Sequence, residues 1–257
     1  MDQLAKYQET VDTKETYVER IGFAKKDFSI KNTRKNRTFN MVKSALRTMS
    51  GPGERCHYCE DSKADEVEHL LPKDVYPEHC YNWNNYLYAC GPCNGHKGSL
   101  CAIIDAETRE LIPFIRLDGQ PFAPPPVGII AIIDQVAENP LDYFYLDIKD
   151  YFLFSELPEQ GTPAYLKAQF TLKTLRLNER PSLIRQRQLA YDHFIHRLTL
   201  YVQEKDRLNP DAVKLSKMEI GIKEEHHQTV WQEMKRQHHQ IPELTSLFVS
   251  APEALGW

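Results

Sequence analysis

The sequence predicts an α+β fold, in which a small cysteine-framed core lies between a basic helical arm and a larger helical region. Two observations predict this fold. Closely spaced cysteine pairs frame a segment rich in His, Asn and Tyr, and apolar residues recur at helical spacing on both sides of it. We therefore divide the chain into an arm over residues 1–50, a core over 51–105, a Pro-rich connection with short strands over 106–160, and a helical region over 161–257.

The arm is expected to be helical and locally basic. Its apolar residues are spaced to bury one stripe of a helix near Thr38–Met49, and Ser50–Gly53 ends that helix. A block with the single acid Asp27 contains the bases Lys25, Lys26, Lys31, Arg34, Lys35, Arg37, Lys43 and Arg47. The net charge of -4 argues against a protein that coats nucleic acid with its whole surface, but this block can neutralise phosphates locally. A solvated helix face is the alternative interpretation.

Two cysteine pairs, Cys56-x2-Cys59 and Cys90-x2-Cys93, are separated by thirty residues. Two residues between paired cysteines let one tight turn present both sulfurs to one ion, and two such turns complete a tetrahedral zinc site. We predict a structural Zn²⁺ here, rather than a redox dithiol or unrelated buried cysteines. Cys80 and Cys101 fall outside the pattern and are expected to be small buried residues.

The residues between and just after the cysteine pairs offer the parts of a phosphodiester-hydrolysing site. His69 can act as the general base, because an imidazole titrates near neutral pH and its second nitrogen can be held by a backbone carbonyl. Glu68 and Asn94 offer oxygen ligands suited to Mg²⁺ or Mn²⁺. Adjacent residues of a regular strand point to opposite faces, so the strand must end or bend at Leu70-Leu71-Pro72 for Glu68 and His69 to serve one site.

The order C-x2-C, acid-His, Asn, C-x2-C-Asn, Lys resembles the HNH endonucleases. The resemblance implies a zinc-stapled ββα-metal nuclease core with His69 as the base and with Glu68 and Asn94 as ligands of the catalytic metal. It makes Asn85 the residue that braces the loop and orients the base, and it places Lys97 against a phosphate. Asn94 stands where many members have His, and His96 competes for that position.

The strings Cys56-His-Tyr-Cys59-Glu60, Glu68–Lys73 and Asn82-Trp-Asn-Asn85 resemble one HNH subgroup, the PtuB nuclease subunits of Septu-type anti-phage systems, including those attached to some retrons. Asn139–Phe144 and the stretch from Ala168 to Arg187 agree with that subgroup. The resemblance implies a complex with an ABC/SMC-like ATPase, PtuA-like, that restrains the nuclease until infection. The chain has no Walker A pattern G-x4-G-K-[ST], so any ATP-dependent control must come from a partner.

The connection is expected to be Pro-rich at Pro121–Pro126, between β-like stretches at Leu111–Ile115 and Val127–Ile133. Helical spacing begins at Ala164, is interrupted at Asn178–Pro181 and resumes over Leu183–Leu208. A further set of histidines in this region is expected to be solvent-exposed rather than to form a second metal site. The set comprises His226, His227, His238 and His239.

No segment approaches the roughly 18 uninterrupted apolar residues of a membrane span, and the polar N-terminus lacks the features of a signal peptide. A cytoplasmic protein is therefore expected, without a membrane partner and with reduced cysteines. The predicted function is an endonuclease that cleaves DNA or RNA in a defence complex. The alternative is a catalytically idle zinc-binding adaptor that holds nucleic acid through its basic arm.

Overall fold

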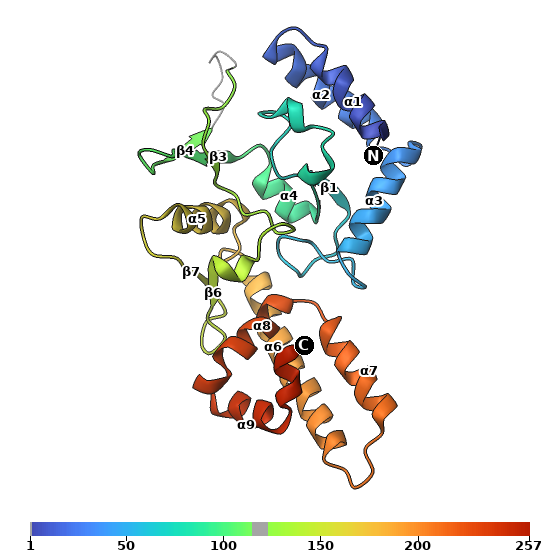
Figure 1. The fold of residues 1–257 in the computed structure, drawn as a ribbon, viewed down its shortest axis with the longest axis vertical. Helices are drawn as coiled ribbons and strands as arrows, with labels where there is room; N and C mark the ends of the chain where they lie inside the picture. Colours follow the sequence, from blue (N-terminus) through green and yellow to red (C-terminus); the bar gives the residue numbers. More distant parts are fainter. Residues whose placement is uncertain (1, 115–122) are drawn as a thin grey trace. The chain divides into compact units, whose positions relative to one another are not determined.

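The computed structural model describes residues 2–114 and 123–257, which form two compact units (Figure 1). The first unit takes Met1–Tyr58, Ser62–Tyr143 and Glu156–Arg176, and the second takes Cys59–Asp61, Phe144–Ser155 and Leu177–Trp257. Ile115, at the end of one predicted strand, and residues 121–122 of the predicted Pro-rich connection lie outside the described residues. No helix within the described ranges is long and apolar enough to cross a membrane.

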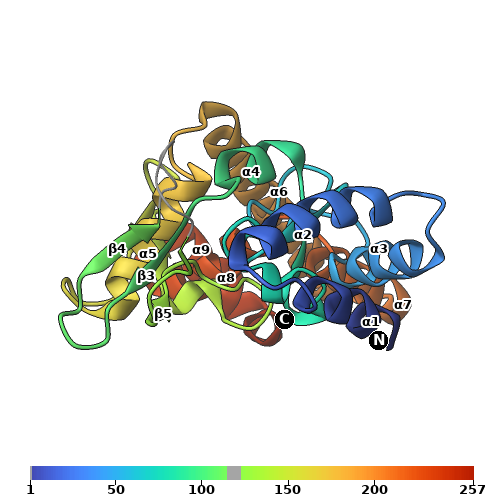
Figure 2. The same cartoon turned by 90° about the horizontal axis from the view of Figure 1, so that it is seen from above.

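Three helices begin the first unit and gather on one side of it (Figure 2). They are α1 (Asp2–Asp12), α2 (Tyr17–Lys31) and α3 (Arg37–Met49). A capping box starts α2, because the Thr16 side chain accepts from the Glu19 backbone and the Glu19 carboxylate accepts from the Thr16 backbone. The predicted helix near Thr38–Met49 is confirmed, and it buries Phe39, Val42 and Leu46.

A two-stranded antiparallel sheet carries the residues between the cysteine pairs. Its strands are β1 (Glu66–His69) and β2 (Tyr86–Ala89), paired so that Glu66 lies opposite Ala89 and His69 opposite Tyr86. Two short 3-10 helices, Pro77–His79 and Trp83–Asn85, lie in the connection between these strands. The short helix α4 (Gly91–Lys97) follows β2 directly and packs against β1. One face of β1 therefore meets α4, while Val67 on the other face joins the core beneath α2 and α3.

A second, three-stranded antiparallel sheet has the order β4-β3-β5. Its strands are β3 (Cys101–Ile104), β4 (Leu111–Phe114) and β5 (Ile129–Ile130), and α5 (Pro163–Leu175) packs against β3. The strand predicted over Val127–Ile133 is thus shorter than expected. Val127 is 98% exposed, and Ala131–Ile133 are buried outside any strand, so apolar content alone overestimated the paired length.

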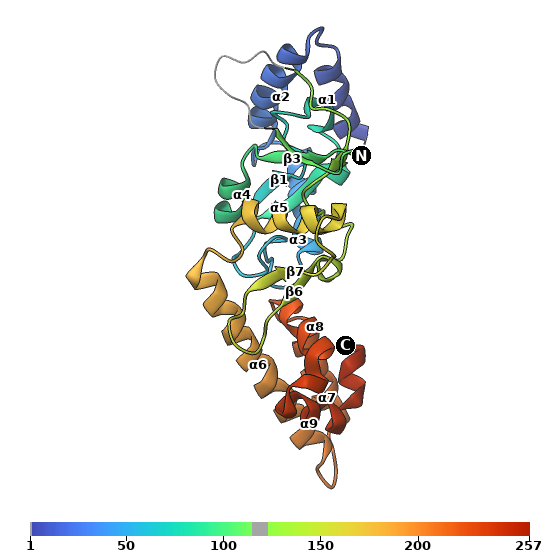
Figure 3. The same cartoon turned by 90° about the vertical axis from the view of Figure 1, so that its left-hand side faces the viewer.

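The second unit is mainly helical, and its core surrounds Trp231, Phe194 and Phe248. Figure 3 shows the long helix α6, against which the later helices pack. The elements are β6 (Phe144–Leu146), β7 (Phe154–Glu156), α6 (Pro181–Lys205), α7 (Ala212–Lys223), α8 (Gln228–Gln237) and α9 (Pro242–Ser250), with 3-10 turns at His238–Gln240 and Pro252–Gly256. Arg187 is 2% exposed and donates to the carbonyls of Phe152 and Leu177, so its role is structural.

The predicted exposure of the C-terminal histidines is wrong for His227. This residue precedes α8 in a left-handed backbone conformation, with φ of 57°, and only 1% of it is exposed. Its Nε2 lies 3.4 Å from the Asp61 carboxylate. His227 belongs to the turn between α7 and α8 rather than to a helix face, so helical periodicity could not place it.

Candidate functional site

The four cysteines of the two pairs come together as predicted. Cys56, Cys59, Cys90 and Cys93 are all buried, none is in a disulfide, and their Sγ atoms all lie within 4.8 Å of one another. Zn–S bonds of about 2.3 Å in a tetrahedron place the sulfurs about 3.8 Å apart, so small side-chain adjustments suffice to bind one ion. The buried, all-sulfur donor set fits a structural zinc ion.

The second cysteine pair is held by the start of α4. Cys90 is the residue that caps this helix, Cys93 lies in its first turn, and Pro92 occupies a position where a missing N–H costs nothing. The first pair is tied to β2, because the His57 backbone donates to the carbonyl of Tyr88. The predicted zinc frame therefore joins the end of β2 to the turn before β1.

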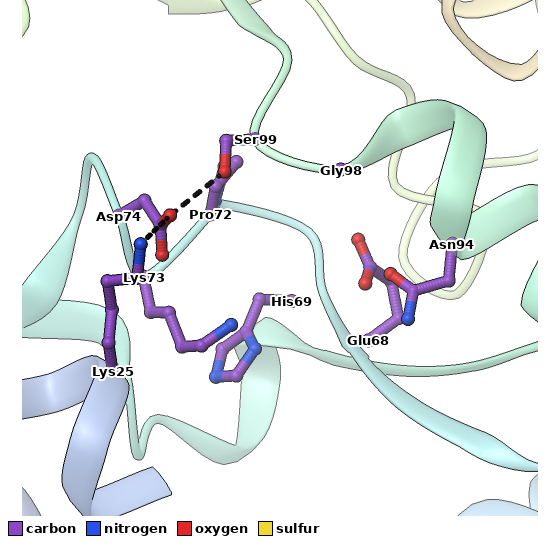
Figure 4. Close-up of a pocket in the computed structure, with 9 residues that line it drawn as sticks. All are labelled: Lys25, Glu68, His69, Pro72, Lys73, Asp74, Asn94, Gly98 and Ser99. Atoms are coloured by element: carbon purple, nitrogen blue, oxygen red, sulfur yellow. Dashed lines mark hydrogen bonds and ion pairs between the residues drawn. The ribbon is translucent and has the colours of Figure 1, made fainter. Parts of the chain in front are cut away.

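A cavity of about 200 Å³ lies beside this frame and brings together Glu68, His69 and Asn94 (Figure 4). The strand β1 ends at His69, before the Leu70-Leu71-Pro72 stretch where an end or bend was predicted, and both Glu68 and His69 are paired within it. The other lining residues are Lys25, Pro72, Lys73, Asp74, Gly98 and Ser99. Three segments that are distant in the sequence thus meet at one site. They are α2, the end of β1 with the loop that follows it, and α4 with the turn that follows it.

His69 is 3% exposed and its imidazole is held on several sides. Its Nε2 lies 2.8 Å from the carbonyl oxygen of Cys80, and its ring makes edge contacts with Phe28 and Tyr86. Because that carbonyl can only accept, Nε2 carries the proton and Nδ1 is the basic nitrogen. Burial, followed by the nearby charge of Lys73, lowers the pKa of His69 to about 3, so the ring is neutral at pH 7.

Glu68 projects from β1 toward α4, where it meets Lys97. The Lys97 ammonium donates to Glu68 Oε1 and to the carbonyl of His69, both at 2.6 Å, and the Lys97 side chain is completely buried. Burial raises the pKa of Glu68, and the charge of Lys97 opposes that rise. Two donors of the Lys97 ammonium are thus taken by Glu68 and by the backbone of His69, and the phosphate contact predicted for Lys97 stays a prediction.

Asn94 is oriented by an acid that the sequence interpretation left without a role. Glu66 lies two residues before Glu68 on the same face of β1, and its carboxylate accepts from Nδ2 of Asn94. This bond leaves the amide oxygen of Asn94 available, and Figure 4 shows the Asn94 amide beside the Glu68 carboxylate. His96 does not line this cavity but lines a neighbouring one. The alternation of acids in Glu66-Val-Glu68 was the signal that could have identified Glu66.

Asn85 is 3% exposed and fastens the loop that follows His69. Its side-chain oxygen accepts from the Leu71 backbone at 2.7 Å, and its amide donates to the carbonyls of Leu71 and His79. The loop therefore bonds to Asn85 at both of its ends. Since this loop also contains Cys80, whose carbonyl meets His69, Asn85 contributes to the position of the imidazole.

Positive charge lies at the rim of the cavity and along the arm. Lys25 pairs with Asp74 at 2.8 Å, and Ser99 donates to the same carboxylate, so the pKa of Asp74 is held below its usual range against the effect of burial. Just before α3 and at its first residue, three residues are exposed without an ion pair within the described part of the chain. They are Arg34, Lys35 and Arg37.

Comparison with known proteins finds a relative for part of the chain. A stretch of 63 residues is 49% identical to Septu protein PtuB of Bacillus thuringiensis. The chain is partly similar to PtuB. The match covers 23% of this chain and 24% of that protein, so it spans about a quarter of the relative's length. No family model matches the sequence, and no solved structure matches it.

Proposed function

We propose that this chain hydrolyses phosphodiester bonds of DNA or RNA as an endonuclease of the HNH type. One observation carries the proposal: a neutral imidazole fixed through Nε2, an acid and an amide oxygen line one cavity. Water activation needs a base with one unprotonated nitrogen, and Nδ1 of His69 meets that need. An adaptor that only binds nucleic acid has no use for a base beside two oxygen ligands.

The basicity of His69 depends on what fills the cavity. Burial and the charge of Lys73 both lower the pKa of His69 and so favour the neutral ring. A phosphate group brings negative charge into the same cavity, and that charge raises the pKa of the imidazole toward the range in which a general base works. The Cys80 carbonyl also raises the pKa of His69, because it accepts the Nε2 proton and so stabilises the protonated ring.

Glu68 and Asn94 are the residues that would hold a divalent cation. Mg²⁺ and Mn²⁺ prefer hard oxygen ligands such as these to the soft thiolates of the four cysteines. When bound, the ion supplies positive charge for the phosphate and the leaving oxygen. Lys97 keeps Glu68 oriented through Oε1, and Glu66 keeps the Asn94 oxygen turned outward. Asn85 keeps the base in place through the loop.

The similarity to PtuB supports a role in Septu-type anti-phage defence. We propose that the chain is the effector nuclease of such a system and that an ABC/SMC-like ATPase, PtuA-like, is its partner. The exposed bases before and at the start of α3 offer a surface for substrate phosphates or for this partner.

The direct test is cleavage by the purified full-length protein, with and without a copurifying ATPase. Duplex DNA, single-stranded DNA and structured RNA are supplied with Mg²⁺ or Mn²⁺. We expect His69→Ala to lower the rate by about 10² to 10⁴ while the zinc content and the nucleic-acid affinity stay nearly unchanged. His239→Ala, at an exposed histidine, is the matched control. Equal rates for the parent protein and His69→Ala would show that His69 is not the base and would favour the adaptor function.

A further inference from the structure

A second hollow, of about 380 Å³, adjoins the cavity of Glu68 and His69. The two share the lining residues Asp74, Gly98 and Ser99, so they lie on either side of the turn that follows α4. Gly98, at φ of 46°, ends α4 and directs the chain into this turn. His96, which the proposed reaction does not use, lines only the second hollow.

The chemistry of this hollow differs from that of the catalytic cavity. Its walls are formed by Val75, Leu100 and Phe114, and its polar groups include the His96 imidazole. Leu100 is 42% exposed although its side chain is apolar. The two charged residues at its edge are already engaged, Asp74 by Lys25 and Lys97 by Glu68. Three apolar side chains and two charged residues that are already paired do not suit a second phosphate.

We propose that the hollow receives the base of a nucleotide that flanks the scissile phosphate. This inference rests on the proposed phosphodiester hydrolysis. A phosphate beside Glu68 and Asn94 carries a nucleoside on each side, and the hollow that shares Gly98 and Ser99 lies within the reach of one of them. A base offers a flat apolar face for Phe114 and Leu100 and a polar edge for His96.

The proposal specifies the class of substrate. Bases of an intact duplex are stacked inside the helix, so a base enters a side hollow only from a single strand or after it leaves the stack. The site therefore selects unpaired nucleotides. Every base has an aromatic face, and so stacking gives little preference for sequence.

The experiment measures binding to the full-length His69→Ala protein, in Ca²⁺-free buffer without Mg²⁺ or Mn²⁺, so that the slow residual cleavage expected of this variant does not consume the probe. The probes are a short labelled single strand, the same sugar-phosphate chain without bases, and the corresponding duplex, each made as DNA and as RNA. Affinities are compared with those of the same protein carrying His96→Ala and Leu100→Ala. Both positions are at least partly exposed, so these changes leave the fold intact. Val127→Ala, at a residue that is 98% exposed and outside the hollow, is the matched control.

We expect base removal to weaken binding about tenfold in the His69→Ala protein, which is within the usual range for one stacked base. In the protein that also carries His96→Ala and Leu100→Ala, base removal should weaken binding much less. The control variant should retain the full effect. An equal effect of base removal in both proteins, or a duplex bound as tightly as the single strand, overturns the inference for that sugar. Because the comparison uses binding alone, it decides the role of the hollow even if the parent protein cleaves no probe, which would overturn the proposed hydrolysis separately.

Discussion

The ammonium of Lys97 lies 2.6 Å from Oε1 of Glu68, and both side chains are buried. The same ammonium donates to the carbonyl of His69, so one cation fixes the acid and the backbone of the neighbouring base. Removing one partner of a buried ion pair leaves an uncompensated charge in a medium that solvates it poorly.

Lys97→Met should therefore lower the free energy of unfolding by about 3–5 kcal/mol. The double variant Lys97→Met with Glu68→Gln should recover much of that loss, because neither charge then remains. Denaturant unfolding of the parent, both single variants and the double variant measures the coupling. Losses that simply add would show that the pair does not act as a unit.

Zinc should bind with a stoichiometry of one ion per chain. Cys93→Ser should abolish this zinc and lower the melting temperature, since the ion joins the turn before β1 to the start of α4. Metal analysis and thermal unfolding measure the two effects. Cys101→Ala removes a buried cysteine outside the cluster and serves as the control. Loss of zinc from the control as well would contradict the assignment of the four ligands.

Asn85→Ala should loosen the loop between His69 and Cys80. The substitution leaves the Leu71 N–H and the carbonyls of Leu71 and His79 without their partners, at a cost of about 1–3 kcal/mol for each group that stays buried. Hydrogen exchange of the Leu71 amide should accelerate, and cleavage should fall because the Cys80 carbonyl no longer holds the imidazole in place. Asn84→Ala, at an exposed neighbour, should change neither measurement.

The exposed bases before and at the start of α3 should contribute to nucleic-acid affinity. Replacing Arg34, Lys35 and Arg37 with Ala should weaken binding and flatten its salt dependence, by about 0.9 in the logarithmic slope for each duplex phosphate that the protein no longer neutralises. Fluorescence binding at several salt concentrations gives the slope. A control with the same change in charge replaces the exposed residues Lys149, Lys173 and Lys217. If both variants gave the same slope as the parent, the segment would be only a solvated surface.

Glu68→Ala and Asn94→Ala should lose cleavage by a different route from His69→Ala. Each removes an oxygen ligand, so the affinity for Mn²⁺ should fall and excess Mn²⁺ should partly restore the rate. His69→Ala should keep the parent's Mn²⁺ affinity, and added metal should not rescue it. Calorimetric titration of Mn²⁺ into the three variants separates the two groups. Weaker Mn²⁺ binding in His69→Ala would show that the imidazole is a ligand and not the base.

The features that depend on local spacing, namely the cysteine pairs, α3 and the end of β1, were predictable from the amino-acid sequence alone. Two residues between paired cysteines specified the knuckles that meet in the buried cluster, and helical periodicity located α3. The end of β1 before Leu70-Leu71-Pro72 was also predicted from the sequence, because a proline interrupts strand pairing. These features depend on chain geometry over a few residues, which periodicity and motifs report directly.

The groups that meet those residues from distant parts of the chain were not predictable from local spacing. Three contacts join residues from different segments of the chain. The Cys80 carbonyl meets His69, Lys97 is buried against Glu68, and the Phe28 ring lies beside the imidazole. Their pairing depends on how α2, β1 and α4 pack, and no local pattern encodes that packing. His227 shows the same limit, because its burial follows from a left-handed turn and the approach of Asp61. Long-range packing therefore sets the environment, and hence the chemistry, of side chains whose identity the sequence already supplies.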